Sequence, residues 1–248
     1  MSERLTEAMR PPLIDDCILS HVVNEDDEPV GDSLLAFAQH PYSCCKMFRG
    51  PKGTGKSTAL LALMQAIAGD GYPGFVYKSG QELKIDEIKS LWAWLECSFL
   101  CPKREHFHVL CVEELAKLSP ECSEWIKCAF DVCLPERAVI LCTSNDISKL
   151  HPAVVDRFEH YLFHDSPVFR TDSAKRALRV WQEVLTEPFG VEAPQLDKLV
   201  SMGMRDDTFS FRTLLQKMEQ KLQAVKHNSK PLAQRQQEAN EHAERIGL

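Results

Sequence analysis

The sequence lacks the long apolar runs that membrane spans and secretory leaders need. No stretch approaches the roughly 18 uninterrupted apolar residues of a membrane helix. Residues 1–10 are charged where a leader would turn apolar. The ten cysteines stand mostly inside apolar runs, and no second close pair gives zinc-site spacing. We therefore expect a cytoplasmic or nucleoid-associated protein with reduced thiols and no membrane partner.

Basic charge is also scarce. The chain has 29 Lys and Arg against 36 Asp and Glu, for a net charge of −7. The first 30 residues carry two basic and eight acidic side chains, so the remaining residues sum to 27 − 28 = −1. This balance excludes the broad basic surface of an autonomous nucleic-acid binder. DNA binding by an assembled oligomer stays open.

From about residue 43, short β-rich runs alternate with helical patterns, which predicts βαβ units and a parallel sheet. The expected strands are Ser43–Phe48, Gly74–Tyr77, Phe107–Val112, Ala138–Thr143 and His160–Phe163. After residue 166 the strand patterns stop and three helical segments follow. We therefore predict an acidic N-terminal segment (1–30), an α/β domain (31–165), a helical domain (166–226) and a polar tail (227–248).

One segment carries the most specific chemistry. Residues 50–57 match the pattern G-x4-G-K-[ST] directly after a predicted strand and at the start of a predicted helix. Glycines there let backbone N–H groups surround phosphate oxygens, while Lys56 reaches the outer phosphates and Ser57 can ligate Mg²⁺. The predicted nucleotide-binding residues are Gly50, Lys52, Gly53, Thr54, Gly55, Lys56, Ser57 and Thr58. ATP and Mg²⁺ are the expected cofactors.

A phosphate loop needs an acidic strand end, and Glu113-Glu114 follow an apolar strand. We predict that Glu113 helps to hold Mg²⁺ and that Glu114 polarises the attacking water. Aspartate is usual at the first position, and the extra methylene of Glu113 extends its carboxylate by about 1.5 Å, so we expect slow hydrolysis. Asn145 and Arg157 follow further along. By themselves, the first is typical of a turn and the second of a surface charge.

Taken together, these motifs resemble those of the AAA+ ATPases, and most closely the ATPase subunits of cellular and phage sliding-clamp loaders. The resemblance runs from residue 5 to about residue 222. The segments that carry it are Arg10-Pro11 with residues 14–19, the phosphate loop, residues 79–88, Glu113-Glu114, residues 143–145, residues 152–157 and residues 209–212.

The resemblance implies a P-loop AAA+ core with a five-stranded parallel sheet, followed by a small all-helical lid domain. It implies that Arg10 and Pro11 lie on the adenine side of the nucleotide. It also implies catalytic roles for Asn145 as the first sensor, Arg212 as the lid sensor and Arg157 as a finger that reaches a neighbour's ATP. Clamp-loader fingers stand in a Ser-Arg-Cys triplet, whereas Arg157 stands between Asp156 and Phe158. Loaders also carry a helical collar after the lid, and about two dozen polar residues stand there in this sequence.

Three hypotheses follow. The first is a clamp-loader-like ATPase that oligomerises with ATP and acts on DNA together with a protein partner such as a sliding clamp. The second is a helicase loader or transposition regulator that forms a ring or filament on DNA, with a helicase or recombinase as partner. The third is a scaffold that binds nucleotide with weak or no hydrolysis.

Overall fold

The computed structural model describes residues 5–68, 74–101, 103 and 106–229, which form two compact units. One unit spans Arg10–Arg170. The other combines residues 5–9 with residues 171–229. Within the described residues, no helix has the length and apolar character needed to cross a bilayer.

The larger unit contains a six-stranded sheet with the order β1-β6-β2-β5-β4-β3. Its strands are β1 (Val22–Val23), β2 (Cys44–Arg49), β3 (Phe75–Ser79), β4 (His108–Glu113), β5 (Ala138–Ser144) and β6 (Glu159–Phe163). Strands β2 to β6 are parallel. All five strands predicted from the sequence are confirmed, with ends that differ by at most two residues.

The sixth strand lies within residues 1–30, for which the sequence predicts an acidic N-terminal segment. Strand β1 pairs antiparallel with β6, which places Val22 opposite Phe163. Ile14 of the 3₁₀ turn η1 (Ile14–Asp16), Leu19 and Val22 are buried in the same core as the phosphate-loop helix. The acidic side chains of Asp15, Asp16 and residues 25–28 are exposed on either side of these apolar residues, so the net charge of the segment gives no sign of its contribution to the core.

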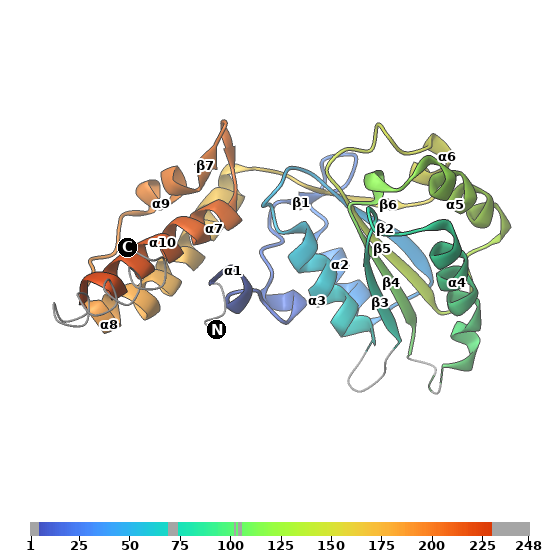
Figure 1. Cartoon of the computed structure of the whole chain (residues 1–248), viewed down its shortest axis with the longest axis horizontal. Coiled ribbons are helices and arrows are strands. Elements are labelled where there is room, and N and C mark those ends of the chain that lie inside the picture. The colour runs from blue at the N-terminus through green and yellow to red at the C-terminus, as the bar shows by residue number, and fades with distance from the viewer. Residues whose placement is uncertain (1–4, 69–73, 102, 104–105, 230–248) are drawn as a thin grey trace, which may run out of the picture. The chain divides into compact units, whose positions relative to one another are not determined.

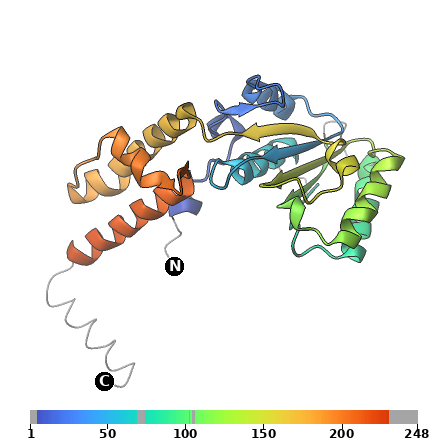
Figure 2. The same ribbon diagram turned by 90° about the horizontal axis from the view of Figure 1, so that it is seen from above.

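Helices cover both faces of the sheet (Figure 1). One face packs against α2 (Gly31–Gln39) and α3 (Lys56–Ala68), and the other against α4 (Ile85–Glu96) and α5 (Pro120–Val132). Both Figure 1 and Figure 2 show α4 and α5 side by side. Strand residues alternate between the two cores: Val109 and Cys111 face α3, whereas Leu110 and Val112 face the opposite helices.

Short elements connect these layers. They are η2 (Cys97–Leu100) after α4, η3 (Leu115–Lys117) after β4 and α6 (Pro152–Val155) before β6. Helix α5 begins at Pro120, because the Ser119 hydroxyl accepts a hydrogen bond from the Cys122 N–H at 3.2 Å and Pro120 needs no donor at the first helical position.

The second unit is mainly helical. It contains α1 (Leu5–Ala8), α7 (Pro167–Trp181) from residue 171 onward, the π-helical turn η4 (Gln182–Thr186), α8 (Glu187–Phe189), α9 (Leu196–Gly203) and α10 (Phe211–Ser229). On α10, Leu214, Leu215 and Met218 are buried. Residues 230–248 of the predicted polar tail lie outside the described residues.

The expectation that this unit is all-helical is wrong in one detail. Strands β7 (Met204–Arg205) and β8 (Thr208–Phe209) form an antiparallel hairpin. Its two loop residues, Asp206 and Asp207, have φ angles of 47° and 63°. Left-handed backbone at both positions matches a two-residue type I′ turn, in which aspartate is tolerated. Strands of two residues are too short for their alternation to show in the sequence.

Candidate functional site

The phosphate loop joins β2 to α3 at the carboxyl edge of the sheet. Gly50, Gly53 and Gly55 have φ angles of 139°, 85° and 94°. A Cβ on Gly50 would also lie 2.2 Å from the carbonyl oxygen of Phe163, so no side chain fits there. Gly50 and Gly55, which the motif requires, and Gly53 between them therefore stand where the backbone of this loop favours glycine.

Lys56 lies across the loop that it follows. Its Nζ donates to the carbonyl oxygens of Gly50 and Pro51 at 2.8 and 2.6 Å, and the residue is 7% exposed. Thr54 is fully buried, and its hydroxyl donates to the Pro51 carbonyl at 3.0 Å. Lys52 is exposed, while Ser57 and Thr58 are half-buried at the start of α3. The loop thus presents its lysine and its hydroxyls from one compact turn.

His21, which the sequence analysis did not predict as a site residue, contacts the backbone of the phosphate loop. The Nε2–H of His21 donates to the Thr54 carbonyl at 2.9 Å, and the residue is 3% exposed. The imidazole packs against the rings of Phe169 and Phe163, with centroids 4.2 and 5.5 Å away. A lone histidine in an acidic stretch gives no cue to such a contact, because it joins segments 33 residues apart.

The two predicted metal-binding residues are in direct contact. Ser57 donates its hydroxyl to one carboxylate oxygen of Glu113, and Tyr77 of β3 donates its hydroxyl to the other. Burial, followed by the hydrogen bond to Glu113 and the carboxylate charge, raises the pKa of Tyr77. Hydroxyl and carboxylate oxygens are ligands that Mg²⁺ accepts, so this pair fits a magnesium ion. Tyr77 was not predicted.

No larger metal-binding cluster competes with this pair. Over the described part of the chain, no group of three or more His, Cys, Asp or Glu side chains is arranged to hold a metal ion. The ten cysteines are free thiols, and burial raises the pKa of the Cys111 and Cys142 thiols.

Glu114 and Asn145 also lie close together. Asn145 Nδ2 lies 3.5 Å from Glu114 Oε1, a long contact, and Lys117 pairs with the other carboxylate oxygen. Glu114 has a φ of 55°, and its N–H donates to the Thr143 hydroxyl at 3.0 Å. A Cβ on Gly80 would lie 2.7 Å from the Glu114 carbonyl oxygen, so Gly80 allows the ends of β3 and β4 to approach. Glu114 therefore lies just past the end of β4, where the backbone turns out of the strand.

A hollow of about 360 Å³ opens beside the loop at the same edge. Its lining residues are Arg49, Gly50, Pro51, Ser144, Asn145, Asp146, Ile147, Leu162, Phe163 and His164. The ends of β2, β5 and β6 therefore surround a space next to the phosphate loop, at the strand edge where open α/β sheets bind ligands.

The predicted arginines and Pro11 stand on other elements. Arg157 follows α6 and donates to Asp131 of α5 at 3.2 Å, with both side chains more than half exposed. Arg212 is exposed on α10 in the second unit. Arg10 is exposed, and its positive charge acts to lower the pKa of Tyr77, so Arg10 lies toward β3. Pro11 is half-buried.

Comparison with known proteins was made for the sequence and for the fold. No protein-family model matches the chain. Among curated proteins, the chain is similar to the replication factor C small subunit of Saccharolobus solfataricus, with 24% identity over 176 residues. The match covers 70% of this chain and 50% of that protein, so the chain spans about half the length of its relative.

The chain is similar to several solved structures at low identity. A mutant of RuvB from Thermotoga maritima has a TM-score of 0.51 and 16% identity, covering 85% of this chain and 73% of that one. A DNA polymerase III gamma subunit-related protein from the same organism gives a TM-score of 0.48 with 15% identity, covering 76% and 70%. PCH-2 from C. elegans gives 0.46 with 16% identity, covering 79% and 66%.

The fold agrees with that of the AAA+ ATPases, as the sequence predicted. The predicted resemblance to clamp-loader ATPase subunits is confirmed by the similarity to the replication factor C small subunit.

Proposed function

We propose that this chain is a clamp-loader-like AAA+ ATPase that oligomerises with ATP and acts in DNA metabolism. One observation carries the proposal. The phosphate loop, the Ser57–Glu113 pair and the Glu114–Asn145 pair converge at one edge of the sheet, in the arrangement that phosphoryl transfer to water needs. The similarity to the replication factor C small subunit supports the assignment to replication-type work on DNA.

Each residue group has a role in this proposal. The loop N–H groups and Lys56 bind the phosphates, and Arg10 and Pro11 flank the base. Ser57 and Glu113 hold Mg²⁺, which when bound neutralises charge on the outer phosphates. Glu114 accepts the proton of the attacking water, and Asn145 orients that water. Arg212 senses the nucleotide from the lid.

Arg157 acts in trans in this proposal, and strand register supports that role. Glu159, two residues after Arg157, pairs with Lys46 on β2. Gly50 lies four residues beyond Lys46, which is roughly 13 Å further along the strand. Arg157 therefore stands toward the amino edge of the sheet, while its own phosphate loop stands at the carboxyl edge. Its exposed guanidinium is suited to the ATP of a neighbouring subunit.

Two alternative functions would use the same nucleotide site. A helicase loader or transposition regulator would use the same shared site in a ring or filament on DNA. A nucleotide-binding scaffold with weak hydrolysis would be favoured by Glu113, whose carboxylate contacts Ser57 directly.

The oligomeric state with nucleotide and DNA distinguishes the proposed function from its alternatives. We expect sedimentation of the protein with a non-hydrolysable ATP analogue and duplex DNA to show an oligomer that ADP does not support. Electron microscopy of that sample would distinguish a closed spiral from a filament. A protein that stays monomeric with ATP analogue and DNA would contradict the proposed function.

Lys56→Ala is expected to lower ATP affinity by about tenfold or more, because a charge-assisted contact contributes about 1.5–3 kcal/mol. Calorimetric titration measures this change. Lys89→Ala, on the exposed side of α4, is the matched control and should bind ATP as the parent does. Because Lys56 also bonds two loop carbonyls, thermal unfolding should accompany the titration. Parent affinity in a folded Lys56→Ala protein would refute the phosphate-loop assignment.

Glu113→Asp is expected to raise turnover by roughly two- to tenfold, equivalent to about 0.4–1.4 kcal/mol in the barrier. Mg²⁺ keeps several of its waters, and a carboxylate that reaches Ser57 directly crowds them. Calorimetry should show tighter Mg²⁺ binding to the nucleotide-bound variant. Tyr77→Phe removes one partner of Glu113 without shortening it, and should change turnover less. A slower Glu113→Asp variant would show that the site is adapted to glutamate.

A further inference from the structure

A buried lysine in the middle of the phosphate-loop strand has no part in the site described so far. Lys46 of β2 is 1% exposed. Its ammonium contacts the Glu159 carboxylate, donates to the Tyr161 hydroxyl at 3.0 Å and lies 3.3 Å from the Tyr42 hydroxyl. It also lies 4.3 Å from the centroid of the Phe37 ring. Lys46 is thus held by an anion, two hydroxyls and an aromatic face.

Burial of the Lys46 ammonium costs free energy unless all of its partners are in place. Lys46 shares its face of β2 with Cys44 and Phe48, which belong to the apolar core. Burial acts to lower the pKa of Lys46, but hydrogen bonds to Glu159 and Tyr161 outweigh it and raise that pKa. Only the ammonium is buried, because the Glu159 side chain is 46% exposed, and an ion pair that reaches solvent contributes little to stability. The pair therefore calls for a reason other than stability, and its position suggests one.

Lys46 and Glu159 are direct cross-strand neighbours in the register of β2 and β6. Glu159 is the first residue of β6, and Arg157 stands two positions before it. Phe158, between them, is 6% exposed and packs edge-to-face on Phe130 of α5, with ring centroids 5.6 Å apart. The backbone that carries Arg157 is therefore anchored at two successive residues.

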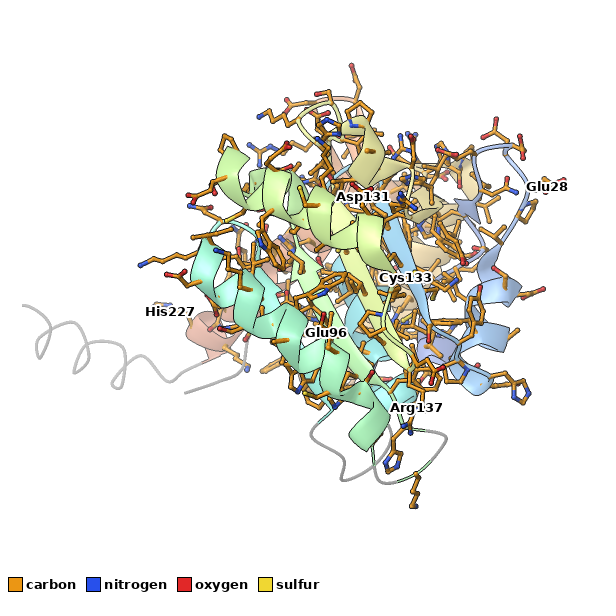
Figure 3. The ribbon with its side chains drawn as sticks, turned by 90° about the vertical axis from the view of Figure 1, so that its right-hand side faces the viewer. Glu28, Glu96, Asp131, Cys133, Arg137 and His227 are labelled. Atoms are coloured by element: carbon orange, nitrogen blue, oxygen red, sulfur yellow. The ribbon has the colours of Figure 1, made fainter. Side chains whose placement is uncertain are left out.

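The Arg157 side chain itself is only lightly held. Among the residues that the structure describes, it pairs with Asp131 at 3.2 Å, and the two side chains are 51% and 59% exposed, so the pair contributes little. Figure 3 labels Asp131 on α5. One hollow of about 430 Å³ is lined by Arg157, Asp131, Tyr42 and Glu159, among others. A rigid backbone with a free side chain is what a residue needs to act on another molecule.

We propose that Lys46 and Glu159 are positioning residues for Arg157: they fix the start of β6 against the phosphate-loop strand, so that the arginine is presented to a neighbouring subunit. The proposal rests on the proposed function, in which Arg157 acts in trans. Because Lys46 stands on the strand that leads into the phosphate loop, the same pair ties the arginine of each subunit to its own nucleotide site.

Glu159→Gln keeps the size of the side chain and removes its charge. We expect turnover to fall by about tenfold to a hundredfold, the loss that a misplaced group of about 1 Å produces, with unchanged ATP affinity. The double variant Lys46→Met and Glu159→Gln removes the buried charge as well and should show the same loss, even where the single variant is less stable. Glu87→Gln, whose carboxylate pairs with Lys78 on β3, is the matched control and should keep parent turnover.

Mixing experiments distinguish positioning from general damage. A Glu159→Gln chain has an intact nucleotide site, so Lys56→Ala chains, which carry an intact Arg157, should restore its activity. Arg157→Ala chains should not restore it, because every interface then has a missing or misplaced arginine. Recovery with both partners, recovery with neither, or parent turnover of the folded double variant would overturn the positioning role. Failure of Lys56→Ala and Arg157→Ala to complement each other would instead overturn the proposed function.

Discussion

Arg157→Ala is expected to bind ATP with the affinity of the parent and to hydrolyse it about 10³-fold or more slowly, since arginines supplied in trans contribute about 10³ to 10⁵ in rate. The physical reason is position. Arg157 stands at the amino side of β6, away from its own phosphate loop, so its loss leaves nucleotide binding untouched. Single-turnover kinetics and calorimetric titration on the same preparation measure the two quantities.

Asp131→Asn is the control for Arg157→Ala. It removes the carboxylate that Arg157 contacts within its own chain and keeps the arginine. Turnover should stay near the parent value, because this exposed pair contributes little. A small loss in Arg157→Ala, equal to that of Asp131→Asn, would show that the arginine is only a surface charge.

Glu114→Gln is expected to retain ATP and to lose turnover by about 10² to 10⁴, the usual contribution of a general base. The amide has the size of the carboxylate and can still contact Asn145, but it cannot accept the proton of water. Bound nucleotide should therefore persist, and sedimentation should show an oligomer that ATP stabilises and that does not dissociate with time.

Glu121→Gln, an exposed carboxylate in the first turn of α5, controls for the loss of one negative charge and should leave turnover unchanged. The outcome that would contradict the assignment is a Glu114→Gln protein that hydrolyses ATP at the parent rate. Water would then be activated by another group, and Glu114 would serve mainly the ion pair with Lys117.

The phosphate loop, its helix and the five parallel strands could be predicted because their information is local. Gly50, Gly53 and Gly55 mark a backbone path, and short apolar runs mark buried parallel strands. Ser57 contacts Glu113 and Glu114 contacts Asn145 because parallel strand ends share one edge, and the sequence motifs predicted roles for these residues but not the contacts.

The rest could not be predicted because it depends on contacts between distant segments. His21 reaches Thr54 across 33 positions, and Lys46 reaches Glu159 across 113. A lysine in a strand pattern gives no sign that two tyrosines and a glutamate will enclose it. The two-residue strand β1 stands in an acidic stretch, and its pairing with β6 is set by the core beneath it.

The most direct test of the account is turnover in a mixture of Lys56→Ala and Arg157→Ala chains. Neither protein alone has a complete site, but an interface between them joins the intact phosphate loop of one chain to the intact Arg157 of the other. The account predicts that the mixture hydrolyses ATP well above the sum of its parts, and that turnover per subunit rises with protein concentration. A mixture as inactive as either variant, with parent turnover per subunit independent of concentration, would contradict a shared site.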